Sequence, residues 1–236
     1  MNSIKSKKLR YDSLLISKVL PCYIFLPILF WLIANTFAFY GSAFILGDIK
    51  RLSVKTVIDD YIPLYTPFIS FYILAYLQWA ICFIAISKSS RKNCYDFFSA
   101  EITGKLIAAF IFFIFPTQMV RTAITGNSVF DKLTDLLYTI DKPITLFPSL
   151  HCFESYVCSR YLARIKGIPK FAKIFCFAFS LLVFASTVLV KQHLFLDIPA
   201  GILVGELGIL ISDKFHFGKF FDKISHILNK KGESEC

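Results

Sequence analysis

C-x-x-C motifs, internal repeats and low-complexity tracts are missing from this sequence of 236 residues. None of its seven cysteines forms a C-x-x-C pair, and no cluster of His, Cys or carboxylate residues has metal-ligand spacing. We therefore expect no metal and no cofactor, and we expect the cysteines to pack as small hydrophobic residues. Because no change in composition marks a boundary, residues 1–236 are predicted to form one domain.

Acidic residues are also scarce: 16 Asp and Glu stand against 26 Lys and Arg, which gives a formal net charge of +10. The basic residues are dispersed at the ends of apolar runs instead of forming one patch. This dispersal favours contact with anionic lipid headgroups over binding of nucleic acid. We expect the partners to be the bilayer and a lipid substrate, and the sequence leaves the oligomeric state open.

Apolar residues, by contrast, are abundant. Hydrophobic residues make up 56% of the chain, aromatic residues 17%, and the mean hydropathy is +0.62, which is typical of an integral membrane protein. A helix needs about 20 mostly apolar residues to cross a bilayer. The sequence therefore predicts an all-α bundle of six transmembrane helices, at roughly 17–45, 61–87, 98–116, 147–165, 169–190 and 194–213.

The basic residues also predict an orientation. Of the 26 Lys and Arg, 19 lie on the side of the N-terminus in this six-span arrangement and seven on the other. The positive-inside rule then places both termini in the cytoplasm, together with a polar tail over 213–236. The first run is much longer than a signal-peptide core, so we expect it to be retained as a span. We expect a multi-pass protein of the plasma membrane.

Polar residues gather at the opposite, extracytoplasmic face. They come from three stretches that are far apart in the sequence, and ionisable groups at such positions are costly. The first stretch follows the third run, the second opens the fourth run, and the third joins the fifth and sixth runs. They contain Arg121, then Ser149, His151 and Glu154, then Ser186, Lys191, His193 and Asp197.

Each of these residues also has a structural explanation. Ser149 follows Pro148 and is suited to an N-cap. His193 and Asp197 have the i,i+4 spacing of a pair on one helix, and Lys191 has the length to snorkel outward. On the cytoplasmic side, Glu101 and Lys105 are expected to form an ion pair or to snorkel. These explanations do not say why the polar residues of all three extracytoplasmic stretches are expected at one depth in the membrane.

The spacing resembles that of the type 2 phosphatidic acid phosphatase family, which shares its active-site pattern with the vanadium haloperoxidases. The family's P-S-x-H motif is similar to residues 148–151, and its S-R-x5-H-x3-D motif matches Ser186, His193 and Asp197. Its K-x6-R-P motif has Arg121 as its counterpart. The resemblance covers about 105–205.

This chain departs from the family pattern at three positions. Ile114 stands where the first motif has lysine, Thr122 where it has proline, and Thr187 where the third motif has arginine. Lys191 is a possible replacement cation, because it follows Thr187 by four residues and would share its helix face. Lys142 is a second candidate. Leu150 stands where many lipid phosphatases have glycine. With this leucine, the stretch FPSLH looks similar to the inositol phosphorylceramide synthase branch of the superfamily.

The resemblance implies a mechanism and assigns roles. His193 would attack phosphorus and form a phosphohistidine, Asp197 would hold the other ring nitrogen, and His151 would protonate the leaving oxygen and then activate water. The residues that would hold the phosphate are Arg121, Ser149, Lys191 and Ser186. We expect Glu154 either to orient His151 or to face a water-filled cleft.

Three functions stay open at this point. The first is a metal-independent lipid phosphate phosphatase that acts on a phosphomonoester or diphosphate at the extracytoplasmic face. The second is a phospho-headgroup transferase of the sphingolipid-synthase type, with a lipid alcohol as acceptor. The third is a non-catalytic lipid-binding or transport protein. The sequence does not identify the lipid, because apolar helices that recognise acyl chains carry no local motif.

Overall fold

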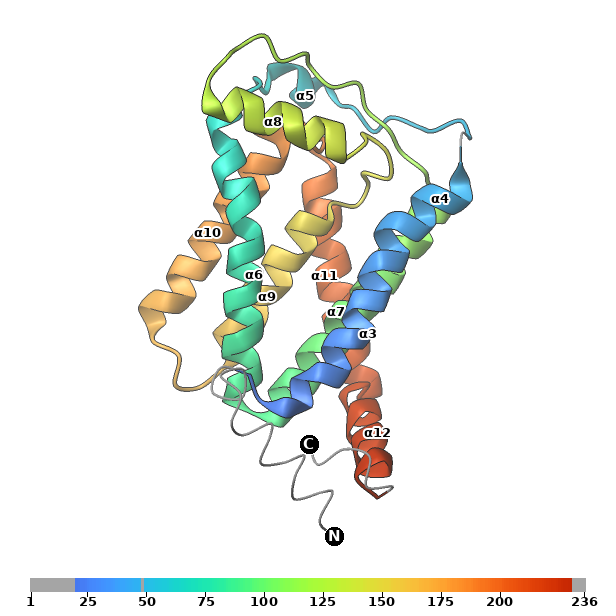
Figure 1. The fold of residues 1–236 in the computed structure, drawn as a ribbon, viewed down its shortest axis with the longest axis vertical. Helices are drawn as coiled ribbons and strands as arrows, with labels where there is room; N and C mark the ends of the chain where they lie inside the picture. The colour runs from blue at the N-terminus through green and yellow to red at the C-terminus, as the bar shows by residue number, and fades with distance from the viewer. Residues whose placement is uncertain (1–19, 48, 231–236) are drawn as a thin grey trace.

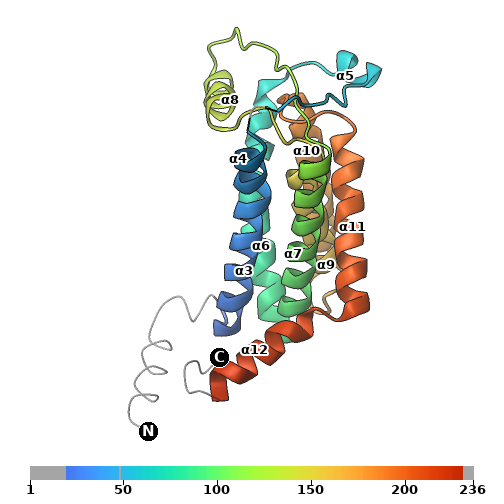
Figure 2. The same ribbon diagram turned by 90° about the vertical axis from the view of Figure 1, so that its right-hand side faces the viewer.

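The structure, a computed structural model, describes residues 20–47 and 49–230 and consists mainly of helices (Figure 1). Six long helical segments run along one axis, and shorter helices close the two ends (Figures 1 and 2). The long segments are α3 (Phe25–Thr36) with its continuation through η2 (Phe37–Gly41) and α4 (Ser42–Leu46), α6 (Ile69–Ser89), α7 (Arg91–Ile114), α9 (Leu150–Arg164), α10 (Lys170–Leu189) and α11 (Asp197–Phe215). The short ones are η1 (Cys22–Ile24), α5 (Val57–Tyr61), η3 (Thr66–Phe68), α8 (Val129–Ile140) and α12 (Gly218–Lys230).

Four of these segments are long and apolar enough to cross a membrane. They are Cys22–Leu46, Thr66–Ser89, Arg91–Ile114 and Lys170–Leu189. The all-helical membrane fold is thereby confirmed, whereas the count of six spans and the orientation of the termini stay predictions. Residues 17–19 of the first predicted span and residues 231–236 of the predicted tail lie outside the described residues.

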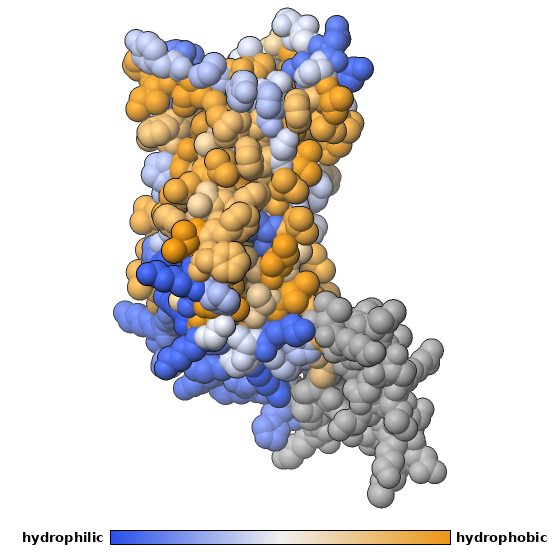
Figure 3. All heavy atoms as spheres, turned by 90° about the vertical axis from the view of Figure 1, so that its left-hand side faces the viewer, coloured by the Kyte–Doolittle hydropathy of each residue, from blue (hydrophilic) through white to orange (hydrophobic). Residues whose placement is uncertain are grey.

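The surface supports a membrane setting. Hydrophobic residues cover most of the height of the face in Figure 3, and hydrophilic residues gather toward its two ends. Side chains such as Ile33, Phe110 and Phe175 are at least 60% exposed although they are apolar. A contiguous apolar surface of this extent indicates burial against lipid.

The helices pack closely because small residues line α11. A Cβ atom added to Gly208 would lie 2.8 Å from the carbonyl oxygen of Ala100 in α7, and one added to Gly205 would lie 2.9 Å from the ring of Tyr156 in α9. Small residues of this kind let helix backbones approach one another inside membranes. α11 is thereby fixed against both α7 and α9, which lie beside it in Figure 2.

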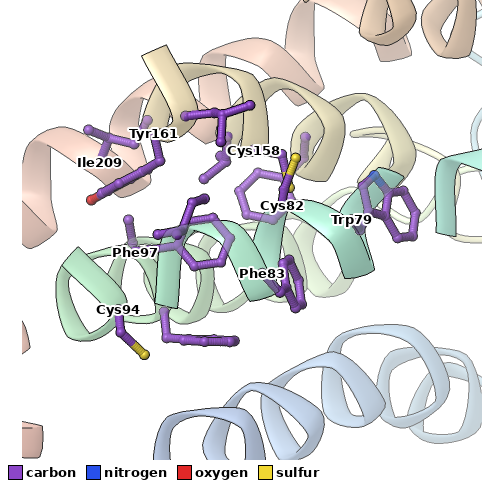
Figure 4. Close-up of a cluster of buried hydrophobic side chains, with 14 of the residues drawn as sticks. Trp79, Cys82, Phe83, Cys94, Phe97, Cys158, Tyr161 and Ile209 are labelled. Atoms are coloured by element: carbon purple, nitrogen blue, oxygen red, sulfur yellow. The ribbon is translucent and has the colours of Figure 1, made fainter. Parts of the chain in front are cut away.

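The core is rich in aromatic side chains. Phe83, Phe97 and Phe98 pack edge to face at 5.2 to 5.3 Å between ring centroids, and Phe97 packs against Tyr161 in the same way (Figure 4). The free, buried cysteines Cys82, Cys94, Cys158 and Cys176 lie among such residues, which confirms their predicted role as small hydrophobic side chains.

Loops and two short helices close the end of the bundle at the top of Figure 1. One of these short helices is α8, and a capping box of Ser128 and Asp131 begins it. The hydroxyl of Thr117 accepts hydrogen bonds from the backbone N–H groups of Leu146 and Phe147, both at 3.0 Å. These bonds tie the segment after α7 to the entrance of α9, where the motif residues begin.

Candidate active site

His193 lies in a tight turn between α10 and α11. The carbonyl oxygen of Thr187 accepts hydrogen bonds from the backbone N–H groups of Gln192 (2.9 Å) and His193 (3.0 Å). Nδ1 of His193 lies 3.1 Å from Oδ2 of Asp197, which also accepts a bond from the N–H of Leu194 at 2.9 Å. Because the buried carboxylate fixes Nδ1, Nε2 is the ring nitrogen available to a substrate.

The expected helical geometry of this pair is wrong in one respect. His193 precedes α11, and Asp197 is the first residue of that helix, so the two are not one turn apart on a continuous helix. The carboxylate instead sits at a helix N-terminus, where the helix dipole favours negative charge. The pairing of His193 with Asp197 itself is present.

Ser149 joins the starts of α9 and α11. Its hydroxyl accepts a hydrogen bond from the N–H of Cys152 at 3.3 Å, as expected for an N-cap, and its own N–H donates to the carbonyl of Asp197 at 3.2 Å. A Cβ atom on Gly201 would lie 2.5 Å from the carbonyl oxygen of Ser149, so only glycine permits this approach. Two helix N-termini therefore face the same region, which favours an anion there.

His151 occupies the first turn of α9 and is held by aromatic rings. Its ring stacks on Tyr72 with centroids 4.0 Å apart and an interplanar angle of 22°, and Tyr76 and Trp79 lie 5.4 and 5.1 Å away. Within the described part of the chain, Nε2 of His151 has no hydrogen-bond partner. The ring is thus fixed by stacking, and this buried nitrogen is a polar atom without a partner in the part of the chain that the structure describes.

Arg121 lies beside the turn that carries His193. Its Nη2 donates to Oε1 of Gln192 at 2.5 Å, and its Nη1 donates to the carbonyls of Asp141 (2.5 Å) and Tyr138 (3.3 Å) at the end of α8. Burial lowers the pKa of Arg121, although nearby Asp141 opposes the shift, and the guanidinium stays charged. Arg121 thus links α8 to the site and places a half-buried cation there.

Lys191 adopts a left-handed backbone conformation with a φ of 51°. The expectation that it shares a helix face with Thr187 is wrong, because α10 ends at Leu189. Its Nζ donates to the carbonyl of Ile62 at 2.5 Å, and burial lowers its pKa. Even so, Lys191 and His193 line the same cavity. The side chain is therefore beside the site because of the turn that follows α10, and not because of a shared helix face.

The other two predicted polar residues lie elsewhere. Ser186 is fully buried in α10 and donates to the carbonyl of Val183 at 2.6 Å. Lys142 is exposed. Among the described residues, neither one lines the cavities around His193. Asp141, in contrast, lines the wall of one of these cavities, and burial raises its pKa.

Two cavities meet at His193. The loop cavity, of about 400 Å³, lies under the loops and has charged residues in its wall, among them Lys55, Asp59 and Lys191. The bundle cavity, of about 340 Å³, extends among the helices and has mainly aromatic and apolar residues in its wall, together with His151 and Glu154. His193 belongs to both walls, so a group bound at His193 has a polar cavity on one side and an apolar cavity on the other.

Three features of the site carried too weak a signal in the sequence. Gln192 orients Arg121, but nothing distinguishes it from a loop glutamine. Tyr72 stacks on His151 from α6, a contact between residues far apart in the chain. Glu154 binds Lys105 of α7. The i,i+3 spacing of Glu154 from His151 was a clue to its position, although not to its partner.

Comparison with protein families identifies the superfamily of the chain. A family model described as the PAP2 superfamily matches residues 43–211. The chain belongs to the PAP2 superfamily. The matched range contains every motif residue from Arg121 to Asp197, so the predicted resemblance is confirmed. Comparison with curated proteins and with solved structures gave no match.

Membership of the PAP2 superfamily gives this protein a broad class. The superfamily is one of phosphatases, and the apolar helices make this chain a membrane protein of the phosphatase type. No group of three or more His, Cys, Asp or Glu side chains suited to hold a metal occurs in residues 20–47 and 49–230. The residues brought together are instead two histidines, a carboxylate and two cations.

Proposed function

We propose that this protein is a lipid phosphate phosphatase that works through a phosphohistidine. The observation that carries the proposal is the position of His193, which is held by Asp197 and shared by a polar cavity and an apolar one. The phosphate of a membrane lipid is charged and its chains are apolar. A substrate at this boundary places each part in a matching environment.

The first half of the reaction forms the enzyme intermediate. Nε2 of His193 attacks phosphorus as the bond from phosphorus to the lipid oxygen breaks, and His151 gives that oxygen a proton. Asp197 stabilises the positive charge that develops on the ring of His193. Arg121, Ser149 and Lys191 are the proposed phosphate-binding residues, since charge stabilisation is the main demand of phosphoryl transfer.

The second half releases phosphate. His151, now without its proton, takes one from a water molecule that attacks phosphorus, and the bond from phosphorus to Nε2 of His193 breaks. The products are the lipid alcohol, inorganic phosphate and the enzyme in its starting protonation state. The loop cavity, with Lys55 and Lys191 in its wall, supplies the polar side from which water enters.

The proposal extends to topology. In the proposed arrangement, α9 and α11 complete six spans, both termini are cytoplasmic, and the site faces the extracytoplasmic side of the plasma membrane. The supporting observation is that the described basic residues of α12, such as Lys219 and Lys223, lie at the end of the bundle away from the site (Figure 2).

One assay tests the function. The purified protein is given a lipid phosphate labelled on phosphorus, with and without a lipid alcohol. Free labelled phosphate supports the phosphatase, a labelled product lipid indicates headgroup transfer, and neither indicates a non-catalytic protein. A second measurement tests the intermediate. The phosphohistidine is supported if the wild-type protein is trapped as an acid-labile labelled phosphoprotein and His193→Ala carries no label.

A further inference from the structure

A group of charged side chains is buried among α3, α7 and α9. Nζ of Lys105 bonds Oε1 of Glu154 and donates to Oδ1 of Asn35 at 3.0 Å, while Oε2 of Glu101 lies 4.0 Å away. Lys105 and Glu101 are fully buried, and Glu154 is 3% exposed. The expected ion pair of Glu101 with Lys105 is therefore present, and the alternative of snorkelling to a membrane surface is not. Ionisable residues at such depth are expensive and usually serve a function.

Only part of this group reaches the substrate space. Glu154 belongs to the wall of the bundle cavity, as do His151 and Asn35, whereas Glu101 and Lys105 do not. Glu154 follows His151 by three residues in α9, which places the two side chains on one helix face about 4.5 Å apart along the axis. The carboxylate is therefore one turn further into the bundle than the histidine.

The two oxygens of Glu154 differ in their partners. Oε1 is bound to Lys105, but Oε2 accepts no hydrogen bond from any residue that the structure describes. A buried carboxylate oxygen without a donor is costly, and the cost falls when a donor is supplied. Because Glu154 lies in a cavity wall, a molecule in that cavity is the available source of the donor.

We propose that Glu154 selects lipids that carry an O–H or N–H donor two or three carbons from the phosphate ester. This inference rests on the proposed function, in which His151 protonates the ester oxygen. A donor at that distance from the ester oxygen reaches the next helical turn, where Oε2 lies. A lipid whose backbone offers only ester carbonyls leaves Oε2 of Glu154 without a donor. It also places an ester oxygen, a second acceptor, beside that carboxylate oxygen.

The charge balance of Glu101, Lys105 and Glu154 also favours a ligand that donates a hydrogen bond. Two carboxylates share one ammonium, so the group holds more acceptors than donors. Trp31 adds a single donor, from Nε1 to Oε2 of Glu101 at 3.4 Å, and this leaves Glu154 unchanged. A lipid amide or hydroxyl improves this balance, and a second acceptor worsens it.

The test compares two double-chain lipid phosphates, of which one carries such donors and the other does not. Ceramide phosphate has two chains, an amide N–H and a free hydroxyl, whereas phosphatidate has two chains and two esters. We expect the wild-type protein to show a kcat/KM for the first that is roughly tenfold to a hundredfold higher, the fold-change of a hydrogen bond to a charged acceptor.

Glu154→Gln reverses the chemistry without changing the volume. The amide oxygen stays on Lys105, because two donors repel, so the amide N–H₂ is presented in place of Oε2. We expect the preference to fall to near one or to invert toward phosphatidate. Glu101→Gln is the matched control: it neutralises the same group outside the cavity wall and should keep the wild-type preference.

The outcomes are separable. Equal rates for the two lipids in the wild type, or a preference unchanged in Glu154→Gln, would overturn the inference and leave the phosphatase intact. Equal loss of activity in both glutamine variants, with a lowered Tm and no change of preference, would assign Glu154 a purely structural role. Absence of phosphate release from either lipid would overturn the proposed function itself.

Discussion

Arg121 and Gln192 are joined by a hydrogen bond, with Nη2 2.5 Å from Oε1. Gln192 is 1% exposed and directly precedes His193 in the chain, so this bond connects the half-buried cation to the turn that carries the proposed nucleophile. Because the carbonyls of Tyr138 and Asp141 hold the other side of the guanidinium, α8 is part of the same unit.

Gln192→Ala should weaken phosphate binding. The substitution leaves Nη2 without its acceptor, and Arg121 is then free to move away from the turn. We expect the inhibition constant of orthovanadate and the KM for the lipid phosphate each to rise roughly tenfold, which is the contribution of one charge-assisted hydrogen bond. Thr139→Ala on α8, which removes only an exposed bond within the helix, is the control. Unchanged inhibition in Gln192→Ala would exclude this role.

Asp197→Asn should retain the fold and lose most activity. The amide oxygen can still accept from the N–H of Leu194, but an amide beside Nδ1 no longer stabilises a positive ring. We expect kcat to fall roughly 1,000- to 10,000-fold. Rapid-quench measurement of phosphoprotein formation checks this, and formation at the wild-type rate would contradict the assignment.

Tyr72 should act on His151 through its ring and not through its hydroxyl. Tyr72→Phe keeps the stacked pair and should leave kcat close to the wild-type value. Tyr72→Leu removes a contact that contributes about 0.5 to 1.5 kcal/mol, so His151 loses its fixed orientation and kcat should fall about tenfold. Similar kcat values for the two variants would show that stacking does not orient the histidine.

Gly201→Ala should separate the starts of α9 and α11. Its Cβ atom would meet the carbonyl oxygen of Ser149 at 2.5 Å, and the backbone has to shift to relieve the overlap. We expect a destabilisation of about 1 to 3 kcal/mol together with loss of activity. Leu203→Ala, at a position of α11 that is 60% exposed, controls for changes in the same helix. Thermal unfolding in detergent and phosphate release measure the two effects.

The attachment of α8 should depend on pH through Asp131. Hydrogen bonds from Ser128 and then Thr66 lower the pKa of Asp131 below its ordinary 3.8. The resulting stabilisation is present above pH 3.8 and is lost as the pH falls through the lowered value. Hydrogen exchange of residues 128–132 should be slower in the wild type than in Asp131→Asn at pH 6. Their exchange rates should converge below about pH 3, and persistent divergence there would contradict this account.

The sequence predicts the helices of this fold well because their apolar runs are long. The run at 98–116 overlaps α7, and the run at 169–190 coincides with α10. The start of α9 follows from local chemistry, since Ser149 after Pro148 is suited to an N-cap. The end of α10 at Leu189 agrees with the predicted run, but the turn after it does not follow from the sequence, because hydrogen bonds from Gln192 and His193 to the carbonyl of Thr187 shape it.

The candidate site is predictable to the same extent. Ser149, His151, His193 and Asp197 are found from motif spacing, and the structure brings them to one end of the bundle. The bonds of Lys105 to Glu154 and of Arg121 to Gln192 join residues 49 and 71 positions apart. Such partners depend on how helices are arranged in space, and no periodic pattern in one segment encodes that arrangement.

The place of His193 between two cavities also affects the fate of the two products. In the proposed reaction, the phosphate leaves through the charged loop cavity into bulk water, while the alcohol leaves through the aromatic bundle cavity into the lipid phase. The two products then occupy different solvents and are diluted independently. The reverse reaction requires both to return to Nε2 at once, so their separation keeps it slow without any moving part.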